Sequence, residues 1–266
     1  MPFVQRIAGA SLLAGALIVS GGGRATRGQT LTASTTHTPF SHDLNDYAIT
    51  GLQDFDTTMK AVFHDDKAAH KISKDAGFIY QLKGNVHVRY KEESNFRADG
   101  TVRGFRASVT INDTRQTFRL AALDIKQTVD LSKSPGKRTS LFQLGMISKH
   151  YLSFTRWEFQ GERMLDGVPC VVFKLTFDPS SHDTSHRTIW IDPRTHITLK
   201  REEYMQDVQG GKLRDVWWFR DPQEVAPGIF FPTRMELDNS EGEKAGETEF
   251  INTRVNLGLQ ANVFRR

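Results

Sequence analysis

Cysteine is almost absent from this chain of 266 residues, since Cys170 is its one example. A lone cysteine excludes an intrachain disulfide. Cys170 stands among Val and Phe in the stretch V-P-C-V-V-F, with no His nearby in sequence. That setting favours a small buried hydrophobic side chain over a catalytic nucleophile.

Short catalytic and nucleotide-binding motifs are also missing. The chain has no G-x-S-x-G elbow, P-loop, Rossmann glycine fingerprint, H-E-x-x-H or C-x-x-C. Glu202 and Glu203 are adjacent in a predicted strand, so they face opposite sides and make a poor glycosidase pair. The best metal candidate, His182-Asp183-x-x-His186, also fits a solvated polar loop. We therefore expect no enzymatic activity, no metal and no cofactor.

An excess of either charge is lacking as well. The chain holds 35 basic and 31 acidic residues, a formal net charge of +4. Arg6 and Arg24 lie in residues 1–25, which contain no acid, so the remainder holds 33 basic and 31 acidic residues. This near balance gives little support to nucleic-acid binding, and we expect no nucleic-acid partner.

A long hydrophobic run is lacking too, although a shorter one stands near the N-terminus. The apolar run Ile7–Ser20 follows Arg6, and Gly23-Arg24-Ala25 fits a small-x-small cleavage site. The run is shorter than the ~20 residues that span a bilayer. We predict a cleaved signal peptide over residues 1–25, export of the mature chain, and a polar disordered linker over residues 26–44. An uncleaved N-terminal anchor is the alternative.

Helical patterns are few. Leu52, Phe55, Met59, Val62 and Phe63 recur at helical spacing and predict a helix over Asp46–His64. The short apolar stretch Ser140–Ile147 predicts a second helix. The rest of residues 45–266 has the pattern of one predominantly β domain.

The central stretch Tyr151–Tyr204 has the clearest strand pattern. Val171, Phe173, Leu175 and Phe177 alternate along one strand and therefore share a face. This stretch predicts an antiparallel meander with one apolar and one charged face. Its predicted parts are strands at Leu152–Phe159, Val168–Phe177, Thr188–Ile191 and Ile197–Tyr204, a charged turn region at Gly161–Gly167 and a turn at Asp192–Thr195.

Further strand patterns flank this meander, with turn signals every ~8–12 residues, as in an antiparallel sheet or barrel. A one-sided sheet with little helix to cover it indicates a ligand-holding half-barrel. The flanking predictions are strands at Gly77–Lys91, Phe105–Ile111, Arg115–Ala121, Leu123–Val129, Leu213–Arg220, Phe230–Leu237 and Glu247–Val255, a hairpin turn at Arg97–Thr101, a loop at Pro222–Gly228 and a closing tail at Leu257–Phe264.

Large aromatic side chains are abundant on the predicted strand faces, which suits an apolar cavity with few polar anchors. Ordinary core packing is the alternative for each ring. Trp190 competes with Ile189 and Ile191 for the inward face, because only one set can point inward. The predicted cavity residues are Trp157, Phe159, Val171, Phe173, Leu175, Trp190, Trp217 and Phe219.

Several of these motifs together resemble the outer-membrane lipoprotein carrier and sorting family, the LolA/LolB-like proteins. The resemblance rests on the signal-peptide pattern, the predicted helix carrying Leu52–Phe63, the strands V-H-V-R-Y and F-R-A-S-V-T-I, the motifs G-V-P-C-V-V-F-K-L, W-I-D-P-R-T and L-K-R-E-E-Y, and the stretches G-G-K-L-R-D-V-W-W-F and P-T-R-M-E-L. The lipidated cysteine of the receptor branch has no counterpart here.

The resemblance implies a mainly β (α+β) fold, in which a single curved antiparallel sheet forms an unclosed barrel covered by a few short helices. It implies a periplasmic, non-enzymatic protein, a monomer, that binds acyl chains or lipoproteins and serves lipoprotein sorting to the outer membrane. An extracytoplasmic sensor that binds an envelope protein with the same half-barrel is the alternative.

Overall fold

The computed structural model describes residues 40–73, 85–102, 104–138, 140–181, 183–205 and 211–264. Thirteen strands dominate it: β1 (Asp54–His64), β2 (Asn85–Lys91), β3 (Asn95–Val102), β4 (Phe105–Asn112), β5 (Arg115–Leu120), β6 (Ile125–Asp130), β7 (Thr155–Leu165), β8 (Val168–Phe177), β9 (His186–Ile191), β10 (Thr198–Tyr204), β11 (Leu213–Ala226), β12 (Ile229–Asn239) and β13 (Lys244–Val255). The helical segments are α2 (Asp66–Ile72), α4 (Lys149–Leu152) and the 3₁₀ helices η1 (Leu44–Tyr47), η2 (Ala121–Leu123), η3 (Pro135–Lys137), η4 (Ser140–Leu144), η5 (Pro179–Ser181) and η6 (Ala261–Phe264).

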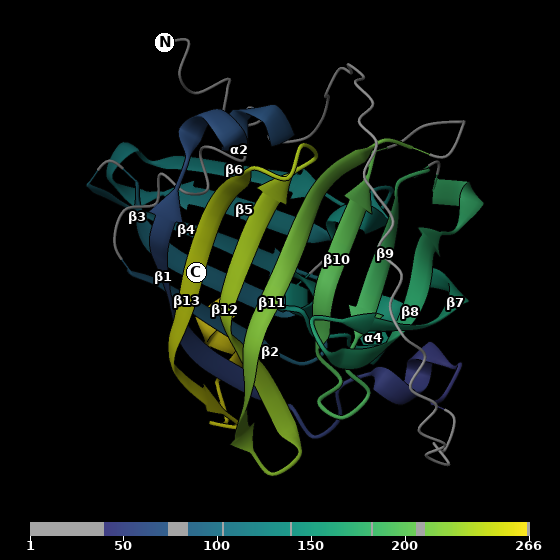
Figure 1. The fold of residues 1–266 in the computed structure, drawn as a ribbon. Helices are drawn as coiled ribbons and strands as arrows, with labels where there is room; N and C mark the ends of the chain where they lie inside the picture. Colours follow the sequence, from purple (N-terminus) through teal and green to yellow (C-terminus); the bar gives the residue numbers. More distant parts are fainter. Residues whose placement is uncertain are drawn as a thin grey trace, which may run out of the picture.

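All thirteen strands belong to one antiparallel sheet, in the order β6-β5-β4-β3-β2-β1-β13-β12-β11-β10-β9-β8-β7. The outermost strands β6 and β7 do not pair with each other, so the barrel stays unclosed. Figure 1 shows the sheet curling, with β2–β5 crossing behind β10–β13. The predicted fold class is therefore confirmed.

The helix predicted over Asp46–His64 is wrong. Residues 54–64 form β1, which pairs with β2 on one side and with β13 on the other. Phe55 and Met59 are four residues apart, a spacing that places two side chains on one face of a helix and also of a strand. Pairing with β2 and β13 decides in favour of the strand, because backbone pairing on both sides outweighs the local helix propensity.

Four other boundaries differ from the prediction. Arg97–Thr101 is part of β3 rather than a hairpin turn, and β11 continues through the predicted loop as far as Ala226. The strand predicted from Leu152 begins at Thr155, after α4, and runs on to Leu165. The Ser140–Ile147 helix is only the 3₁₀ helix η4. β3, β7 and β11 extend through polar stretches because one face of an antiparallel sheet meets solvent and accepts polar side chains.

Other predictions are confirmed. Val168–Phe177 is β8 with the predicted bounds, and the Asp192–Thr195 turn forms. The Asp192 carboxylate accepts hydrogen bonds from Arg194 N and Thr195 Oγ1, both at 2.9 Å.

The predicted signal peptide, most of the linker and residues 77–84 lie outside the described residues. Leu44, the last linker residue, is fully buried and belongs to the folded domain.

A segment between the two outermost strands crosses the concave face of the sheet. We call residues 134–152, apart from residue 139, the cover segment; it contains η3, η4 and α4. Phe142, Ile147 and Tyr151 are buried against β8 and β9, and Leu141, Leu144 and Met146 are buried against the middle of the sheet. This segment thus supplies much of the apolar covering that helices give in other folds.

One glycine lets the cover segment approach the sheet closely. Gly145 has a φ of +76°, and a Cβ atom there would lie 2.7 Å from the ring of the fully buried Phe219. We expect Gly145→Ala to cost about 1–2 kcal/mol for its left-handed backbone and about 1–3 kcal/mol more for overpacking. Urea unfolding measures the loss.

Gly228→Ala is the matched control. Its φ is +74°, but a Cβ atom there would meet nothing within 4 Å. The control variant should therefore show only the backbone part of the cost. Equal losses for the two variants would mean that the cover segment does not press on Phe219.

Candidate functional site

The cover segment divides the concave face of the sheet into a filled half and an open half. In the filled half, Val171, Phe173, Leu175 and Phe219 are each 0% exposed. Leu44 and Tyr47 of η1, with the cover segment, pack against this region. The ring centroids of Tyr47 and Phe173 lie 6.0 Å apart. Half of the predicted cavity residues are therefore packed core in this structure, and contact of the predicted residues with a ligand stays a prediction.

Trp157 and Phe159 lie on β7 at the margin of the filled half and are partly buried. The rings of Phe159 and Phe173 are 5.5 Å apart, and His42 stacks on Phe159 at 3.9 Å. Trp217 of β11 is also partly buried, and it packs against the central core and against the cluster under α2.

The inward face predicted for Trp190 is wrong. Phe173 pairs with Ile189 across β8 and β9, so Ile189 and Ile191 take the concave face and Trp190 the convex one. The Lys200 ammonium lies 4.4 Å from the Trp190 ring and 5.1 Å from the ring of Trp218. Two tryptophans thus belong to each face of the sheet, Trp157 and Trp217 inside, Trp190 and Trp218 outside.

The open half is the concave side of β3–β6, which we call the open apolar face. Register places Phe96 beside Ile111, Ala98 beside Val109, and Val109 beside Phe118. The intervening residues on the other side are Arg, Lys, Asp, Asn, Ser and Thr, while Gln116 and Gln127 are polar residues on the apolar side. The face consists of Phe96, Ala98, Phe105, Val109, Ile111, Phe118, Ile125 and Val129, of which Phe105 and Val129 are exposed and the others partly buried.

The open apolar face continues directly into the central core. Tyr90 and Val88 of β2 pair with Phe96 and Ala98, and both β2 residues are buried. Phe105 and Val129, by contrast, are 45% and 44% exposed. The strand predicted at Phe105–Ile111 belongs to this face, but none of the face's residues is among the predicted cavity residues, because a strand pattern predicts which side is apolar and not how far that side is exposed.

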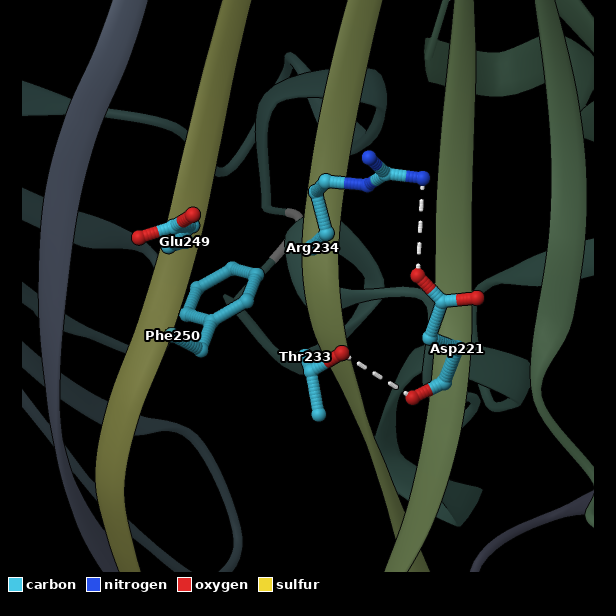
Figure 2. A pocket seen from close by; sticks show the side chains of 5 residues that line it. All are labelled: Asp221, Thr233, Arg234, Glu249 and Phe250. Atoms are coloured by element: carbon cyan, nitrogen blue, oxygen red, sulfur yellow. Dashed lines mark hydrogen bonds and ion pairs between the residues drawn. The ribbon is translucent and has the colours of Figure 1, made fainter.

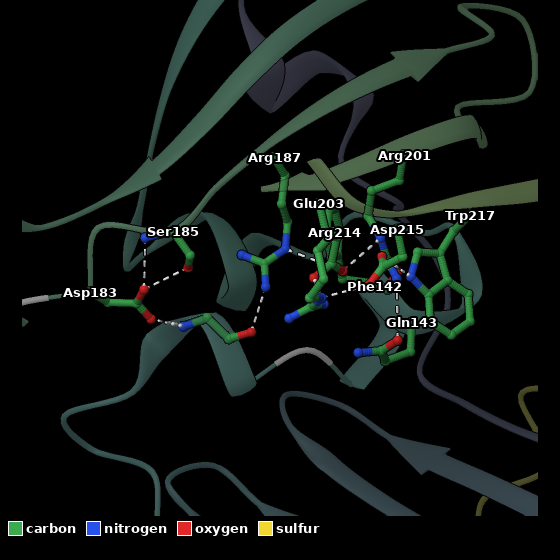
Figure 3. A network of polar contacts seen from close by, with 11 residues as sticks. Phe142, Gln143, Asp183, Ser185, Arg187, Arg201, Glu203, Arg214, Asp215 and Trp217 are labelled. Atoms are coloured by element: carbon green, nitrogen blue, oxygen red, sulfur yellow. Dashed lines mark hydrogen bonds and ion pairs between the residues drawn. The ribbon is translucent and has the colours of Figure 1, made fainter. Parts of the chain in front are cut away.

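A network of buried charges on β9, β10 and β11 lies under the cover segment (Figure 3). Arg187 comes from β9, Arg201 and Glu203 from β10, and Arg214 and Asp215 from β11. Glu203 lies at its centre: its carboxylate is 3.0 Å from Arg201 Nε, 2.5 Å from Arg214 Nη2 and 3.5 Å from Arg187 Nε. Asp215 accepts from Arg214 Nε at 2.6 Å and from Trp217 Nε1 at 2.8 Å.

Two arginines of the network also hold the cover segment. Arg201 Nη1 donates to the Phe142 carbonyl oxygen, and Arg187 Nη2 donates to the Gly136 carbonyl oxygen, both at 2.6 Å. Gly136 N in turn donates to Asp183 at 3.2 Å. The arginines therefore fix both η3 and η4 over the sheet.

Electrostatics within the network follow from burial and from the paired charges. Burial alone raises the pKa of Glu203, but Arg187, Arg201 and Arg214 outweigh burial and lower this pKa to about 2. Burial raises the pKa of Asp215, and the neighbouring Glu203 adds to the rise while Arg214 opposes it. Glu203 is therefore the fixed counter-charge of the arginines at neutral pH.

The described residues offer no arrangement suited to covalent catalysis near these groups. Cys170 is buried, and burial raises the pKa of its thiol to about 12, far from a reactive thiolate. His186 of the predicted metal loop stacks on Tyr204 at 4.4 Å, and His182 lies outside the described residues. In this part of the chain, no group of three or more His, Cys, Asp or Glu side chains is placed to hold a metal ion.

A pocket of about 300 Å³ opens where β12 and β13 stop pairing (Figure 2). The last pair of this ladder is Arg234 with Glu249. Asp221 lies beside Arg234 at 3.4 Å and accepts a hydrogen bond from Thr233 on its carbonyl oxygen at 3.1 Å. Phe250 is the one apolar residue of the lining, so this pocket is less suited to an acyl chain than the open apolar face.

Within the described ranges, no helix has the length and apolar character to cross a membrane. The longest helix there, α2, has only seven residues.

Comparisons with known proteins agree on the fold. Residues 140–266 match a family described only as an uncharacterized protein. No curated protein matches the sequence. A DUF1329 family protein from Desulfovibrio piger superposes with a TM-score of 0.56 at 15% identity, covering 83% of this chain and 92% of that one.

Two further structures have the same architecture. A putative outer membrane lipoprotein-sorting protein domain from Vibrio parahaemolyticus has a TM-score of 0.56 at 14% identity, covering 83% of this chain and 92% of its own. A LolA superfamily protein from Nitrosomonas europaea has a TM-score of 0.55 at 12% identity, covering 84% and 94%. The fold of this chain is LolA-like, as its strand and turn motifs predicted.

Proposed function

We propose that this protein binds the acyl chains of lipids or lipoproteins on the open apolar face, outside the cytoplasm and without catalysis. The observation that carries the proposal is the half-exposed apolar face of β3–β6, which is continuous with the core of a LolA-like sheet. An apolar sheet face of this size is normally covered, and exposed apolar surfaces mark binding sites. The lipoprotein-sorting name of a structure with this fold supports acyl chains as the occupant.

Acyl chains suit this face energetically. Each CH₂ group that leaves water gains about 0.8 kcal/mol before ordering costs. The face offers aromatic and β-branched side chains on four adjacent strands, with Gln116 and Gln127 among them and the charged residues of those strands on the opposite side. The finer proposal is that the cargo is a lipoprotein bound for the outer membrane.

Phe118→Gln tests the site, because Phe118 lies on the open apolar face beside Val109. Loss of ring contact is worth about 1.5–3 kcal/mol, so we expect affinity for a dansyl-labelled long-chain fatty acid to fall roughly tenfold or more. Titration of the purified protein with the labelled acid measures this. Thr117→Gln, on the opposite face of the same strand, should bind as the wild type does.

Tryptophan emission gives a second readout from the same titration. A chain on the concave side should perturb Trp217, so the Trp218→Phe variant keeps the response and Trp217→Phe weakens it. Absence of saturable binding to any acyl ligand would overturn the proposal. Binding that Phe118→Gln leaves unchanged would place the ligand elsewhere on the molecule.

A further inference from the structure

The buried network contains more positive than negative charge. Three guanidinium groups face two carboxylates, those of Glu203 and Asp215. Arg201 is 0% exposed and Arg187 is 4% exposed. A further carboxylate, Asp183, connects to Arg187 through the Gly136 peptide, which accepts from the arginine and donates to the aspartate. Buried cations are costly unless they are fully paired, so this excess needs a reason.

Beyond their contacts with Glu203, the two most buried arginines bond, among the described residues, only to uncharged oxygens, which for Arg201 include Gln143 Oε1 at 3.3 Å. Arg201 Nη1 donates to the Phe142 carbonyl and Arg187 Nη2 to the Gly136 carbonyl, each over 2.6 Å. Both acceptors lie in the cover segment, which is a separate layer from the sheet that carries the arginines. A neutral carbonyl satisfies a guanidinium donor less well than an anionic oxygen does.

One donor is unused in this arrangement. Arg187 Nη1 is buried and has no hydrogen-bond partner among the described residues. The Arg187 guanidinium lies 5.1 Å from the ring centroid of Phe177 and 5.7 Å from that of Phe142. A planar guanidinium with one open donor, beside a second guanidinium, suits an anion with two or more oxygens.

The network also adjoins both solvent and the apolar side of the sheet. The Arg214 side chain is 39% exposed, so the cluster reaches the surface at this residue. Trp217 donates to Asp215 and packs against the central core from which the open apolar face extends. A ligand with an anionic head and an apolar tail would thus find partners for both parts along one face.

We propose that Arg187 and Arg201 form a subsite for the anionic head group of the acyl ligand, a carboxylate or a phosphate. Its oxygens take the acceptor positions that the Gly136 and Phe142 carbonyls hold in this structure, and the cover segment moves aside from the arginines. This inference rests on the proposed function and names the ligand class: anionic rather than neutral acyl compounds.

Three ligands with the same sixteen-carbon chain test the inference: palmitic acid, hexadecanol and hexadecyl phosphate. Each is titrated against the wild-type protein loaded with a fluorescent acyl probe, and its displacement constant is measured. We expect at least one anionic ligand to bind tenfold or more tightly than the alcohol. The acid and the phosphate, compared with each other, distinguish a fatty-acid source from a phospholipid source.

Variants assign the preference to the arginines. Arg187→Gln should reduce the affinity of the preferred anion to that of hexadecanol and leave hexadecanol binding within about twofold. Arg220→Gln is the matched control, because Arg220 lies on the convex face, 4.3 Å from Trp218, and should keep the preference. Arg187→Lys should restore part of it.

The outcomes separate the two proposals. Equal affinity of the wild type for all three ligands would overturn the anionic subsite and leave acyl binding standing. Absence of binding by all three would overturn both. If Arg187→Gln does not fold, the wild-type comparison and Arg187→Lys decide, because a purely structural arginine would give no preference for anions over the alcohol.

Discussion

Glu203→Gln is expected to destabilise the protein by roughly 3–5 kcal/mol at neutral pH, the usual cost of removing one partner from a buried ion pair. The glutamate is buried and lies within 3.5 Å of three arginine side chains. Glutamine keeps the shape but removes the charge, so the excess of buried positive charge rises by one. Urea unfolding followed by circular dichroism measures the difference.

The same variant gives a pH dependence with a definite sign. Glu203 has a pKa of about 2 in the folded protein, below its usual value of 4.5. A lowered folded-state pKa contributes stability that is fully present above pH 4.5 and is lost as the pH falls through 2. The difference between wild type and Glu203→Gln should therefore be largest above pH 5 and should shrink between pH 4.5 and 2.

Glu236→Gln is the matched control for both measurements. Glu236 lies on the convex face, and its ion pairs with Arg220 and Arg234 are 3.6 and 3.7 Å long. The Glu236 side chain is 15% exposed, but its cationic partners, which include Lys244 at 3.4 Å, are 27–39% exposed, so we expect these partly solvated pairs to contribute about 0–1 kcal/mol. Similar losses for Glu203→Gln and Glu236→Gln would contradict the central role of Glu203 in the network.

Phe173→Glu should abolish cooperative folding. Phe173 is 0% exposed and contacts the rings of Tyr47 and Phe159. Losing the ring costs about 3–5 kcal/mol, and the introduced carboxylate must be buried without a partner, which adds several kcal/mol. The sum is comparable to the whole stability of a typical domain. Circular dichroism and thermal unfolding of the purified variant measure the effect.

Thr176→Glu provides the control on the same strand. Thr176 faces the convex side and pairs with Arg156 of β7, so a carboxylate there meets solvent and a positive charge. We expect a change in stability below about 1 kcal/mol. A folded Phe173→Glu protein that had lost acyl binding would show instead that the filled half opens to receive ligand, as the sequence alone suggested.

The central meander could be predicted because its pattern is local. In β8, alternation of Val171, Phe173, Leu175 and Phe177 specified both the strand and its buried face, and flanking turn residues specified its ends. The family motifs then implied the unclosed barrel. Trp190 could not be placed this way, since both faces of β9 carry large apolar residues and register with β8 decides between them.

Two features depended on contacts that sequence patterns do not contain. The local pattern of β1 predicts a helix because it contains no trace of the pairing with β13, whose Ile251 is 194 residues from Thr57. The charge network was missed because charged residues in a strand are normally assigned to the solvent side. One signal for the network was present in the sequence. Arg201 and Glu203 lie two residues apart on β10 and therefore share a face, and register pairs them with Trp217 and Asp215 of β11.

The pairing of β1 with β13 has a consequence for how the chain folds. Each other pair of neighbouring strands is consecutive in sequence, whereas Thr57 and Ile251 are 194 residues apart. The loop-closure entropy grows with separation, so β1–β6 and β7–β13 can each form from local contacts before their junction closes. Until then both inner edges present unpaired backbone to other molecules. Closure within one molecule does not depend on concentration, while pairing between molecules does, so dilution favours the correctly joined sheet.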